Sequence, residues 1–597
     1  MELSYLDWGV IIVFFILSLW IGFIGTKKAG ESSVNFFLSG RSMPWYVLGI
    51  SMVATTFSCD TPNLVTNLVR ESGVAANWNW WAFLLTGMLT VFVYAKLWNR
   101  SKALTDLEFY EVRYSGKGAS FLRGFRAIYL GAFFNIVIIA SVSLAMIKIG
   151  GVMLNLSPLN TLLITSVIVL FYSMAGGLTS ILLTDFFQFV IAMIGAVGAA
   201  YFVVTSPEVG GLHNLMTHPN VIPKLDIVPD LNNWDMLLTL FLIPLAVQWW
   251  SVWYPGAEPG GGGYIAQRML AAKNEKHAIK ATLLFNFFHY AIRPWAWIIV
   301  ALASLIVFPD LASLNSAVEG VSKNIVANDI AYPIMLEKFL PSGFLGLVVA
   351  SLIAAYMSTV SSQINWGASY IVNDWYTRFI DKKASEKRKV RVGQIATLSI
   401  VILSMFIALT LTSALQAFQI LLQIGAGTGL IYILRWFWWR INAYTEIAGM
   451  IISFVVAITL AILKNNHIIE LKDYAEILLG VGITTVGWLL VTFLTPPTDQ
   501  EQLRAFYKKI RPGGPGWKRV VKQAEKENIT LVKEEDLAYD VPTGILCMIL
   551  GTVAIFSCLF GIGFILYENP TYAISYFVAC AIFTFLLFRN MKKLKTL

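Results

Sequence analysis

The chain has 597 residues, of which 57% are hydrophobic and 14% aromatic. Charged residues make up only 13%, roughly half the share found in ordinary soluble domains. This composition indicates a polytopic membrane protein and excludes soluble enzymes and nucleic-acid binders. We attribute the net charge of +9 to Lys and Arg in cytoplasmic loops. The expected surroundings are a lipid bilayer, with no nucleic-acid partner.

Fifteen apolar segments are long enough to cross a bilayer as helices, which takes about 20 residues each. With the N-terminus outside, the cytoplasmic loops and their flanks, including the loop 254–280, hold 36 Lys and Arg, whereas the external loops hold 7. This asymmetry favours an N-terminus outside and a C-terminus inside. We predict an all-α, multi-pass protein of the cell membrane, inner or plasma, with spans at residues 7–25, 44–69, 75–98, 125–148, 161–178, 185–205, 236–253, 281–308, 343–372, 392–411, 415–434, 445–463, 474–494, 541–566 and 572–588.

Two of these spans do not follow the rules for a continuous helix. ATTFSCDTP interrupts the second in the middle of the membrane at 54–62, and the seventh passes Pro244 and then reaches YPGAEPGGGGY at 254–264. Non-helical backbone at membrane depth requires protein or a water-filled cavity to satisfy its polar groups. The two spans are five apart and cross in opposite directions, which is typical of two five-helix inverted repeats with a binding site between them. Proline and glycine also occur in ordinary membrane helices, so that simpler interpretation stays open here.

This interpretation divides the chain into seven parts. They are an extra N-terminal helix with a cytoplasmic loop (1–43), the first inverted repeat (44–205), an external loop (206–235), the second inverted repeat (236–440), two accessory helices (441–494), a cytoplasmic linker (495–540), and two C-terminal helices with a basic tail (541–597).

The ninth span carries a stripe of small and polar residues on one helix face. Its members recur every three or four residues, with Thr359 and Ser361 beside them; they are Ser351, Ala355, Ser358, Ser362, Asn365 and Ser369. Small residues of this kind serve close helix packing. Hydroxyl and carbonyl oxygens are also the ligands that small hard cations prefer. Both interpretations stay open from the pattern alone.

Several segments together resemble the sodium/solute symporter family, which includes sodium-coupled glucose, proline, pantothenate and iodide carriers. They are GRSMPWYVLGISMVATTFS (40–58), GGLTSILLTDFFQ (176–188), YIAQRMLAAKNEKHA (264–278), AAYMSTVSSQ (354–363) and WWRIN (438–442). The likeness runs from the first span to about the eleventh. It implies a ten-helix core of spans two to eleven, with the first and sixth core helices broken and one extra helix in front.

The resemblance also implies where sodium binds. The principal site would use main-chain carbonyls and two hydroxyls, from Ala54, Phe57, Ala355, Ser358 and Thr359. Some family members hold a second sodium ion, and its pattern is matched by Asp185, Ser358, Ser361 and Ser362. An acidic residue near the membrane edge is also commonly an ion-pair partner or a helix cap, so Asp185 has two interpretations.

The solute site is less defined. Positions that bind sugar in sugar-carrying relatives correspond here to Thr56, Asn79, Ala82, His289 and Phe418. Several of these have lost polarity, so the sugar pocket is not reproduced. Charged residues inside a membrane mark sites by default. Asp60 has the alternatives of pairing with Arg70 or capping a half-helix, and Glu258 that of lying at the cytoplasmic mouth. Our candidates for solute contact are Thr56, Asp60, Asn79, Glu258, His289 and Gln419.

The function expected from these features is sodium-coupled secondary active symport. Na⁺ is the coupling ion, the cargo is a small organic solute imported by alternating access, and no obligate protein partner is inferred. The alternatives are a proton-coupled or sodium-independent transporter of the same fold, and a membrane sensor or channel without coupled transport. An enzyme is not expected, because the five histidines and four cysteines are scattered without catalytic or metal-ligand spacing.

Overall fold

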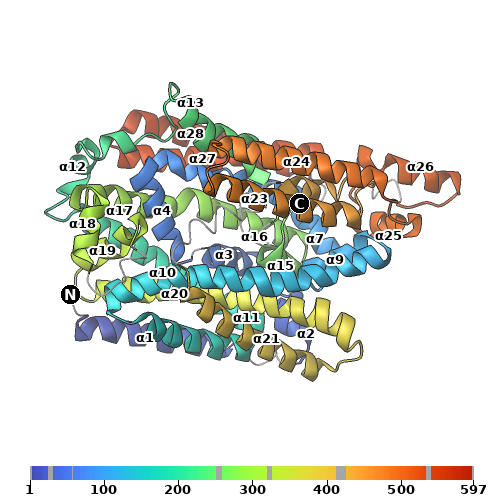
Figure 1. Cartoon of the computed structure of the whole chain (residues 1–597), viewed down its shortest axis with the longest axis horizontal. Coiled ribbons are helices and arrows are strands. Elements are labelled where there is room, and N and C mark those ends of the chain that lie inside the picture. The colour runs from blue at the N-terminus through green and yellow to red at the C-terminus, as the bar shows by residue number, and fades with distance from the viewer. Residues whose placement is uncertain are drawn as a thin grey trace.

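The computed structural model describes residues 3–24, 31–56, 58–250, 258–318, 326–411, 425, 427–532 and 539–594. Helices dominate this part of the chain, and the long ones run side by side along the longest axis of the molecule (Figure 1). An isolated bridge joins Met43 to Ala272.

The helices are α1 (Tyr5–Ile24), α2 (Ser33–Leu38), α3 (Trp45–Thr56), α4 (Asp60–Ser72), α5 (Trp78–Trp81), α6 (Leu84–Leu89), α7 (Ala95–Ser101), α8 (Phe109–Arg113), α9 (Gly116–Ile128), α10 (Asn135–Leu154), α11 (Pro158–Val204), α12 (Gly211–Thr217), α13 (Trp234–Leu237), α14 (Ile243–Ala246), α15 (Gly263–Ala271), α16 (Glu275–Phe287), α17 (Pro294–Val307), α18 (Leu311–Ala317), α19 (Ala331–Phe339), α20 (Phe344–Tyr370), α21 (Glu386–Ala408), α23 (Ala443–Asn465), α24 (Asp473–Leu494), α25 (Gln500–Ile510), α26 (Lys518–Lys526), α27 (Val541–Leu566) and α28 (Pro570–Met591).

Eleven helices among the described residues are long and apolar enough to cross a membrane. Three shorter apolar helices, at Trp45–Thr56, Pro158–Leu170 and Trp234–Ala246, fall on the second, fifth and seventh predicted spans. The predicted span 415–434 lies mostly outside the described residues. The chain is thus an all-α polytopic membrane protein, and the count of fifteen spans stays a prediction.

The spans differ in how deeply they are buried. The apolar window of the span at Phe344–Ile380, which contains α20, is 89% buried, whereas that of α28 is 11% buried. Small side chains allow α20 to pack closely on α11: a Cβ atom at Gly195 of α11 would lie 2.8 Å from Ser351 Oγ. The stripe predicted from the sequence therefore lies in the interior, and α28 exposes apolar side chains, as a lipid-facing helix does.

The long helix α11 turns sharply at Gly177, between the fifth and sixth predicted spans. The residue has φ 54° and ψ −152°, a conformation that is favourable only for glycine. A Cβ atom there would lie 2.5 Å from the carbonyl oxygen of Phe36. The break in direction needs both the conformational freedom and the small size of this glycine.

The first helix is joined to the start of α20 by one carboxylate. Asp7 Oδ1 accepts hydrogen bonds of 2.7 Å from the amides of Gly343 and Gly346. Gly343 is the residue that precedes α20 and Gly346 lies in its first turn, where N–H groups have no partner within the helix. Asp7 is 1% exposed, so α1 and α20 are connected by a buried N-terminal cap.

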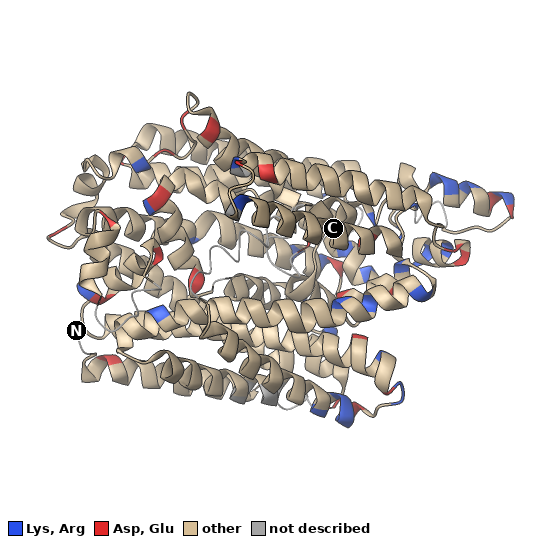
Figure 2. Cartoon of the chain, viewed as in Figure 1, with Lys and Arg blue, Asp and Glu red and all other residues tan. Residues whose placement is uncertain are grey.

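Lys and Arg residues gather at one end of the bundle, the end that also carries α25 and α26 (Figure 2). This is the end to which the predicted topology assigns the cytoplasmic loops. Both short helices belong to the predicted linker 495–540, which therefore contains local helix. Trp517, between them, is fully buried and donates a 2.9 Å hydrogen bond to the carbonyl of Trp436, so this part of the linker packs against the bundle.

Candidate ion and solute sites

The predicted break in the second span lies between α3 and α4. Helix α3 ends at Thr56 and α4 begins at Asp60, so the last carbonyl groups of α3 point out of a helix end inside the bundle. Thr359 of α20 meets this end: its Oγ1 donates a 2.8 Å hydrogen bond to the carbonyl of Thr55. Hydroxyl and carbonyl oxygens thus converge where α3 and α20 cross.

The residues expected at the principal sodium site are distributed around this crossing. Ala54 precedes Thr55 on α3, and Ala355 lies about one turn before Thr359 on α20. Ser358 adjoins Thr359, and both side chains are 1% exposed. Such oxygens suit a small hard cation. Phe57, the fifth expected ligand, lies outside the described residues.

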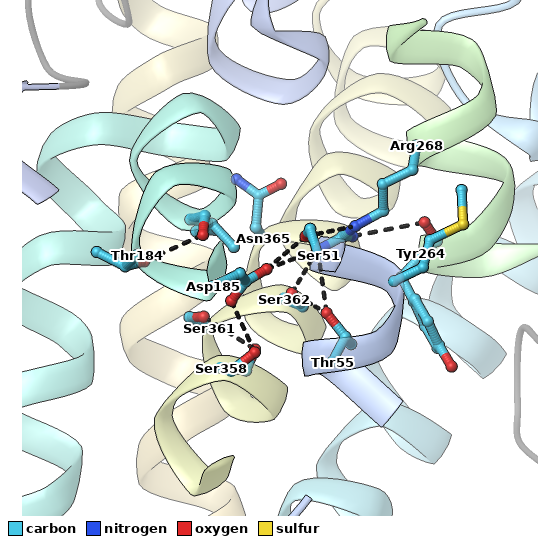
Figure 3. Close-up of polar contacts among 12 residues, drawn as sticks. Ser51, Thr55, Thr184, Asp185, Tyr264, Arg268, Ser358, Ser361, Ser362 and Asn365 are labelled. Carbon is cyan, nitrogen blue, oxygen red and sulfur yellow. Dashed lines mark hydrogen bonds and ion pairs between the residues drawn. The ribbon is translucent and has the colours of Figure 1, made fainter. Parts of the chain in front are cut away.

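Asp185, the acidic residue of the expected second site, is fully buried on α11. Ser358 Oγ donates a 2.7 Å hydrogen bond to Asp185 Oδ1, and Ser51 of α3 donates one to Oδ2 (Figure 3). Three helices, α3, α11 and α20, therefore meet at this carboxylate.

The guanidinium of Arg268, on α15, joins these contacts. We call the resulting cluster of side chains the Asp185 pocket; its members are Ser51, Thr55, Asp185, Arg268, Ser358 and Ser362. Its Nη2 lies 2.6 Å from Ser362 Oγ, 3.2 Å from Thr55 Oγ1 and 3.7 Å from Asp185 Oδ2. Its Nε donates to Ser51 Oγ at 3.2 Å. Arg268 is fully buried, whereas its position in the predicted cytoplasmic loop 254–280 indicates a loop charge. A second cation bound to Asp185 in this arrangement would stand beside the guanidinium, and two like charges about 4 Å apart repel by about 4 kcal/mol at an effective dielectric constant of 20.

The other hydroxyls of the stripe bond within their own helix. Ser361 Oγ donates to the carbonyl of Ser358 at 3.0 Å, Ser351 Oγ to that of Val348 at 2.8 Å, and Ser369 Oγ to that of Trp366 at 2.7 Å. These are the local bonds that serine commonly makes in membrane helices. Only the middle of the stripe reaches across to other helices through hydroxyl groups.

A second polar cluster lies at the end of α3, around Thr56. His289 Nδ1 is 3.2 Å from Thr56 Oγ1, and Arg293 Nη2 is 3.4 Å from His289 Nε2. The ring of Trp80 meets the His289 ring edge-on, with centroids 5.7 Å apart. The structure thus brings two of the predicted solute residues, Thr56 and His289, into contact.

Asp60 and Asn79 are positioned by other contacts. Asp60 is the first residue of α4, and a negative charge is favourable at a helix N-terminus. Arg70, its alternative partner, donates instead to Ser304 Oγ and to the carbonyl of Phe308. The carbonyl of Asn79 accepts a 3.2 Å hydrogen bond from Gln248.

Glu258 belongs to a buried cluster of charges. Its carboxylate pairs with Arg126 of α9 and, at 3.0 Å, with Arg435 Nη2. Arg435 also lies 3.5 Å from Glu446 of α23. Two guanidinium groups and two carboxylates therefore balance in charge. Gln419 lies outside the described residues.

A small cavity borders Glu258 and the start of α15. Its volume is about 20 Å³, room for roughly one water molecule. The remaining lining comes mainly from α6, α16 and their continuations: Phe83, Thr86, Gly87, Thr90, Gly261, Ile265, Thr282, Phe285, Asn286 and Tyr290. The packing is therefore closed to an organic solute at this point.

Sequence reasoning missed the roles of Ser51, Thr55 and Arg268 at the Asp185 pocket, and the partners of Glu258. The signal for Arg268 was present, because it lies in YIAQRMLAAKNEKHA (264–278), one of the segments that carry the family resemblance. Its charge alone did not distinguish a loop from a buried pocket.

Comparison with known proteins gives the relatives of this chain. The sodium/myo-inositol cotransporter of Bos taurus is 27% identical over 556 residues, which cover 83% of this chain and 74% of that protein. The sodium/glucose cotransporter of Vibrio parahaemolyticus is 27% identical over 476 residues, 77% of this chain and 85% of the relative.

Among solved structures, a Na⁺-coupled sialic acid symporter superposes with a TM-score of 0.65 at 18% sequence identity. The superposition covers 83% of this chain and 99% of that one, so the two share a fold. A model of the sodium:solute symporter family matches residues 36–453. Because this match spans most of its length, the chain belongs to the sodium:solute symporter family: it is a multi-pass membrane transporter and not an enzyme.

Proposed function

We propose that this protein imports a small organic solute by sodium-coupled alternating access. The observation that carries the proposal is the hydrogen bond from Thr359 to the carbonyl of Thr55. It places a hydroxyl of α20 against the open end of α3, where oxygen ligands from two helices are available to one ion. Membership of a sodium:solute symporter family supports sodium as that ion.

In this proposal, sodium joins the two helices that form the site. Ala54 and Phe57 would supply carbonyls from the second span, and Ala355, Ser358 and Thr359 would supply oxygens from α20. Sodium binding then favours the state in which α3 and α20 are held together, and solute binding favours the same state. Such coupling through a shared equilibrium is reciprocal, so the solute raises the affinity for sodium by the same factor.

We further propose that the core consists of two inverted five-helix repeats, with the N-terminus outside and the C-terminus inside. The offset of the two broken spans supports the repeats. The gathering of Lys and Arg at one end of the bundle supports the orientation.

The solute is proposed to bind beside the end of α3, next to Thr56 and His289. Asp60 follows the end of α3 by four residues, and Asn79 precedes Trp80, whose ring meets that of His289. Glu258 and Gln419 are the two remaining residues proposed to contact the solute. The names of the relatives supply probes for the solute: myo-inositol, glucose and sialic acid. We also propose a second sodium ion at Asp185, Ser358, Ser361 and Ser362, in competition with the guanidinium of Arg268.

The ion site is tested by thermal unfolding of the purified protein in sodium, potassium and choline chloride at equal ionic strength. A ligand that binds only the folded state stabilises it by about 2.7 kcal/mol at one hundred times its Kd. We expect a sodium-specific rise in Tm that Thr359→Ala reduces. Ser369→Ala is the matched control, because its hydroxyl bonds within α20. Equal Tm values in the three salts would contradict the proposal.

Transport is tested in proteoliposomes with the three probes, under an inward sodium gradient or an inward proton gradient. Uptake driven by sodium alone supports the proposal. Uptake driven by the proton gradient and indifferent to sodium would favour the proton-coupled alternative.

A further inference from the structure

The pocket around Asp185 contains one negative and one positive side chain, both from the protein itself (Figure 3). Arg268 Nη2 lies 3.7 Å from Asp185 Oδ2, and neither residue is exposed. A buried carboxylate without a counter-charge is strongly unfavourable. The guanidinium therefore neutralises Asp185 without any bound ion.

The oxygens expected to hold a second sodium ion are already engaged by this arrangement. Ser362 accepts a hydrogen bond from Arg268, and Ser358 donates a hydrogen bond to Asp185. Ser361 donates one to the carbonyl of Ser358. A sodium ion at Asp185 would need these oxygens to turn their lone pairs toward it. It would also stand next to the guanidinium, in an interior where charge repulsion is poorly screened.

The same guanidinium joins helices that the breaks would otherwise leave separate. Arg268 lies on α15, the helix that follows the break in the seventh span, and it donates to Ser51 and Thr55 of α3. Its neighbour Gln267 donates to Asn365 Oδ1 of α20 at 3.0 Å. Withdrawal of the guanidinium would therefore remove the hydrogen bonds that hold α15 against α3.

We propose that the guanidinium of Arg268 and a sodium ion are alternative occupants of the Asp185 pocket. This inference rests on the proposed sodium coupling. With Arg268 in the pocket, the charge of the guanidinium balances that of the carboxylate, and α15 is held against α3. A sodium ion enters only as the guanidinium leaves, and its entry frees α15. The pocket thus couples ion occupancy to the position of a half-helix.

The test uses Arg268→Met, which keeps a long side chain but removes the charge. The full-length variant and the wild type are heated in sodium chloride or choline chloride at equal ionic strength. We expect sodium to raise the Tm of the variant by several degrees more than that of the wild type, with half-maximal effect at a lower sodium concentration. Asp185→Asn added to the variant should abolish the excess, and Arg268→Lys should respond as the wild type does.

Guanidinium chloride at low millimolar concentration gives a second readout. It should stabilise Arg268→Met in choline and weaken its response to sodium, because the free ion replaces the missing side chain. Wild type should show neither effect.

An Arg268→Met protein that responds to sodium as the wild type does would overturn the proposal. If that variant does not fold, Thr55→Val takes its place, since it removes one acceptor of the guanidinium and leaves the printed hydrogen bonds of the Asp185 carboxylate intact. It should give a smaller gain in the same direction, and no gain would then overturn the proposal. The proposed function is contradicted by a different result, namely a wild type whose Tm shows no sodium-specific rise.

Discussion

Thr359 on α20 donates a 2.8 Å hydrogen bond to the carbonyl of Thr55, in the last turn of α3. The bond joins α20, whose span has an apolar window that is 89% buried, to α3, a helix that ends inside the bundle. Because the contact involves a main-chain carbonyl, it depends on where α3 ends more than on which side chain Thr55 carries.

Ser358→Ala should raise the sodium concentration needed for half-maximal stabilisation. Ser358 is shared by both expected sodium sites and also donates to Asp185. A tenfold rise corresponds to the loss of an interaction worth about 1.4 kcal/mol, and we expect a change of this order. Sodium titrations followed by Tm give the value. Ser351→Ala, from the same stripe, should titrate like the wild type, since its hydroxyl bonds to Val348.

Gly177→Ala should destabilise the protein in every salt. Alanine is strained at φ 54°, and its Cβ would meet the carbonyl of Phe36 at 2.5 Å, so we expect a loss of about 1–3 kcal/mol. Gly480→Ala on α24 is the control, because nothing lies within 4 Å of a Cβ atom there. A Gly177→Ala protein with the Tm of the wild type would show that the turn in α11 relaxes at no cost.

Glu258→Gln should lower stability in the absence of any solute. The change leaves Arg126 and Arg435 with one carboxylate fewer in a buried cluster, and breaking a buried pair costs about 3–5 kcal/mol. Thermal unfolding measures the loss. Glu208→Gln breaks an exposed pair with Lys338 and should change little. A fully stable Glu258→Gln protein with impaired uptake would instead support solute contact by Glu258.

Trp517→Ala should loosen the linker without affecting the sodium response. The indole stacks on Phe506 with centroids 5.5 Å apart and bonds to the carbonyl of Trp436. Replacing a buried tryptophan by alanine costs about 3–5 kcal/mol, here mostly in the docking of α25 and α26. Hydrogen exchange should become faster in these helices. Exposed Lys522→Ala is the control, and unchanged exchange in Trp517→Ala would argue against docking through this residue.

Much of the helical architecture could be predicted because hydropathy and loop charge are local properties. The break at 54–62 and the inward face of the ninth span were likewise visible in residue spacing, and the structure has a helix end at Thr56 and a buried α20. Which serines reach across to other helices was not visible. Ser351 and Ser358 belong to one stripe, yet only Ser358 has Asp185 within reach.

Charged residues were harder to place. Arg268 and Glu258 look alike in the sequence, as charges beside a glycine-rich break, and both are buried because partners come from distant positions. Asp185 precedes Arg268 by more than eighty residues, and Arg435 follows Glu258 by 177. No pattern within one segment records such pairs.

The buried cap from Asp7 to the start of α20 gives the first helix mechanical importance. One side of α1 faces outward, with Trp20 63% exposed and Ile16 61% exposed, so we expect its tilt to respond to the thickness of the surrounding hydrocarbon. Through Asp7, a change of tilt pulls on the helix that carries Ser358 and Thr359. Under the proposed sodium coupling, we therefore expect bilayer thickness to act on sodium affinity from outside the transport core.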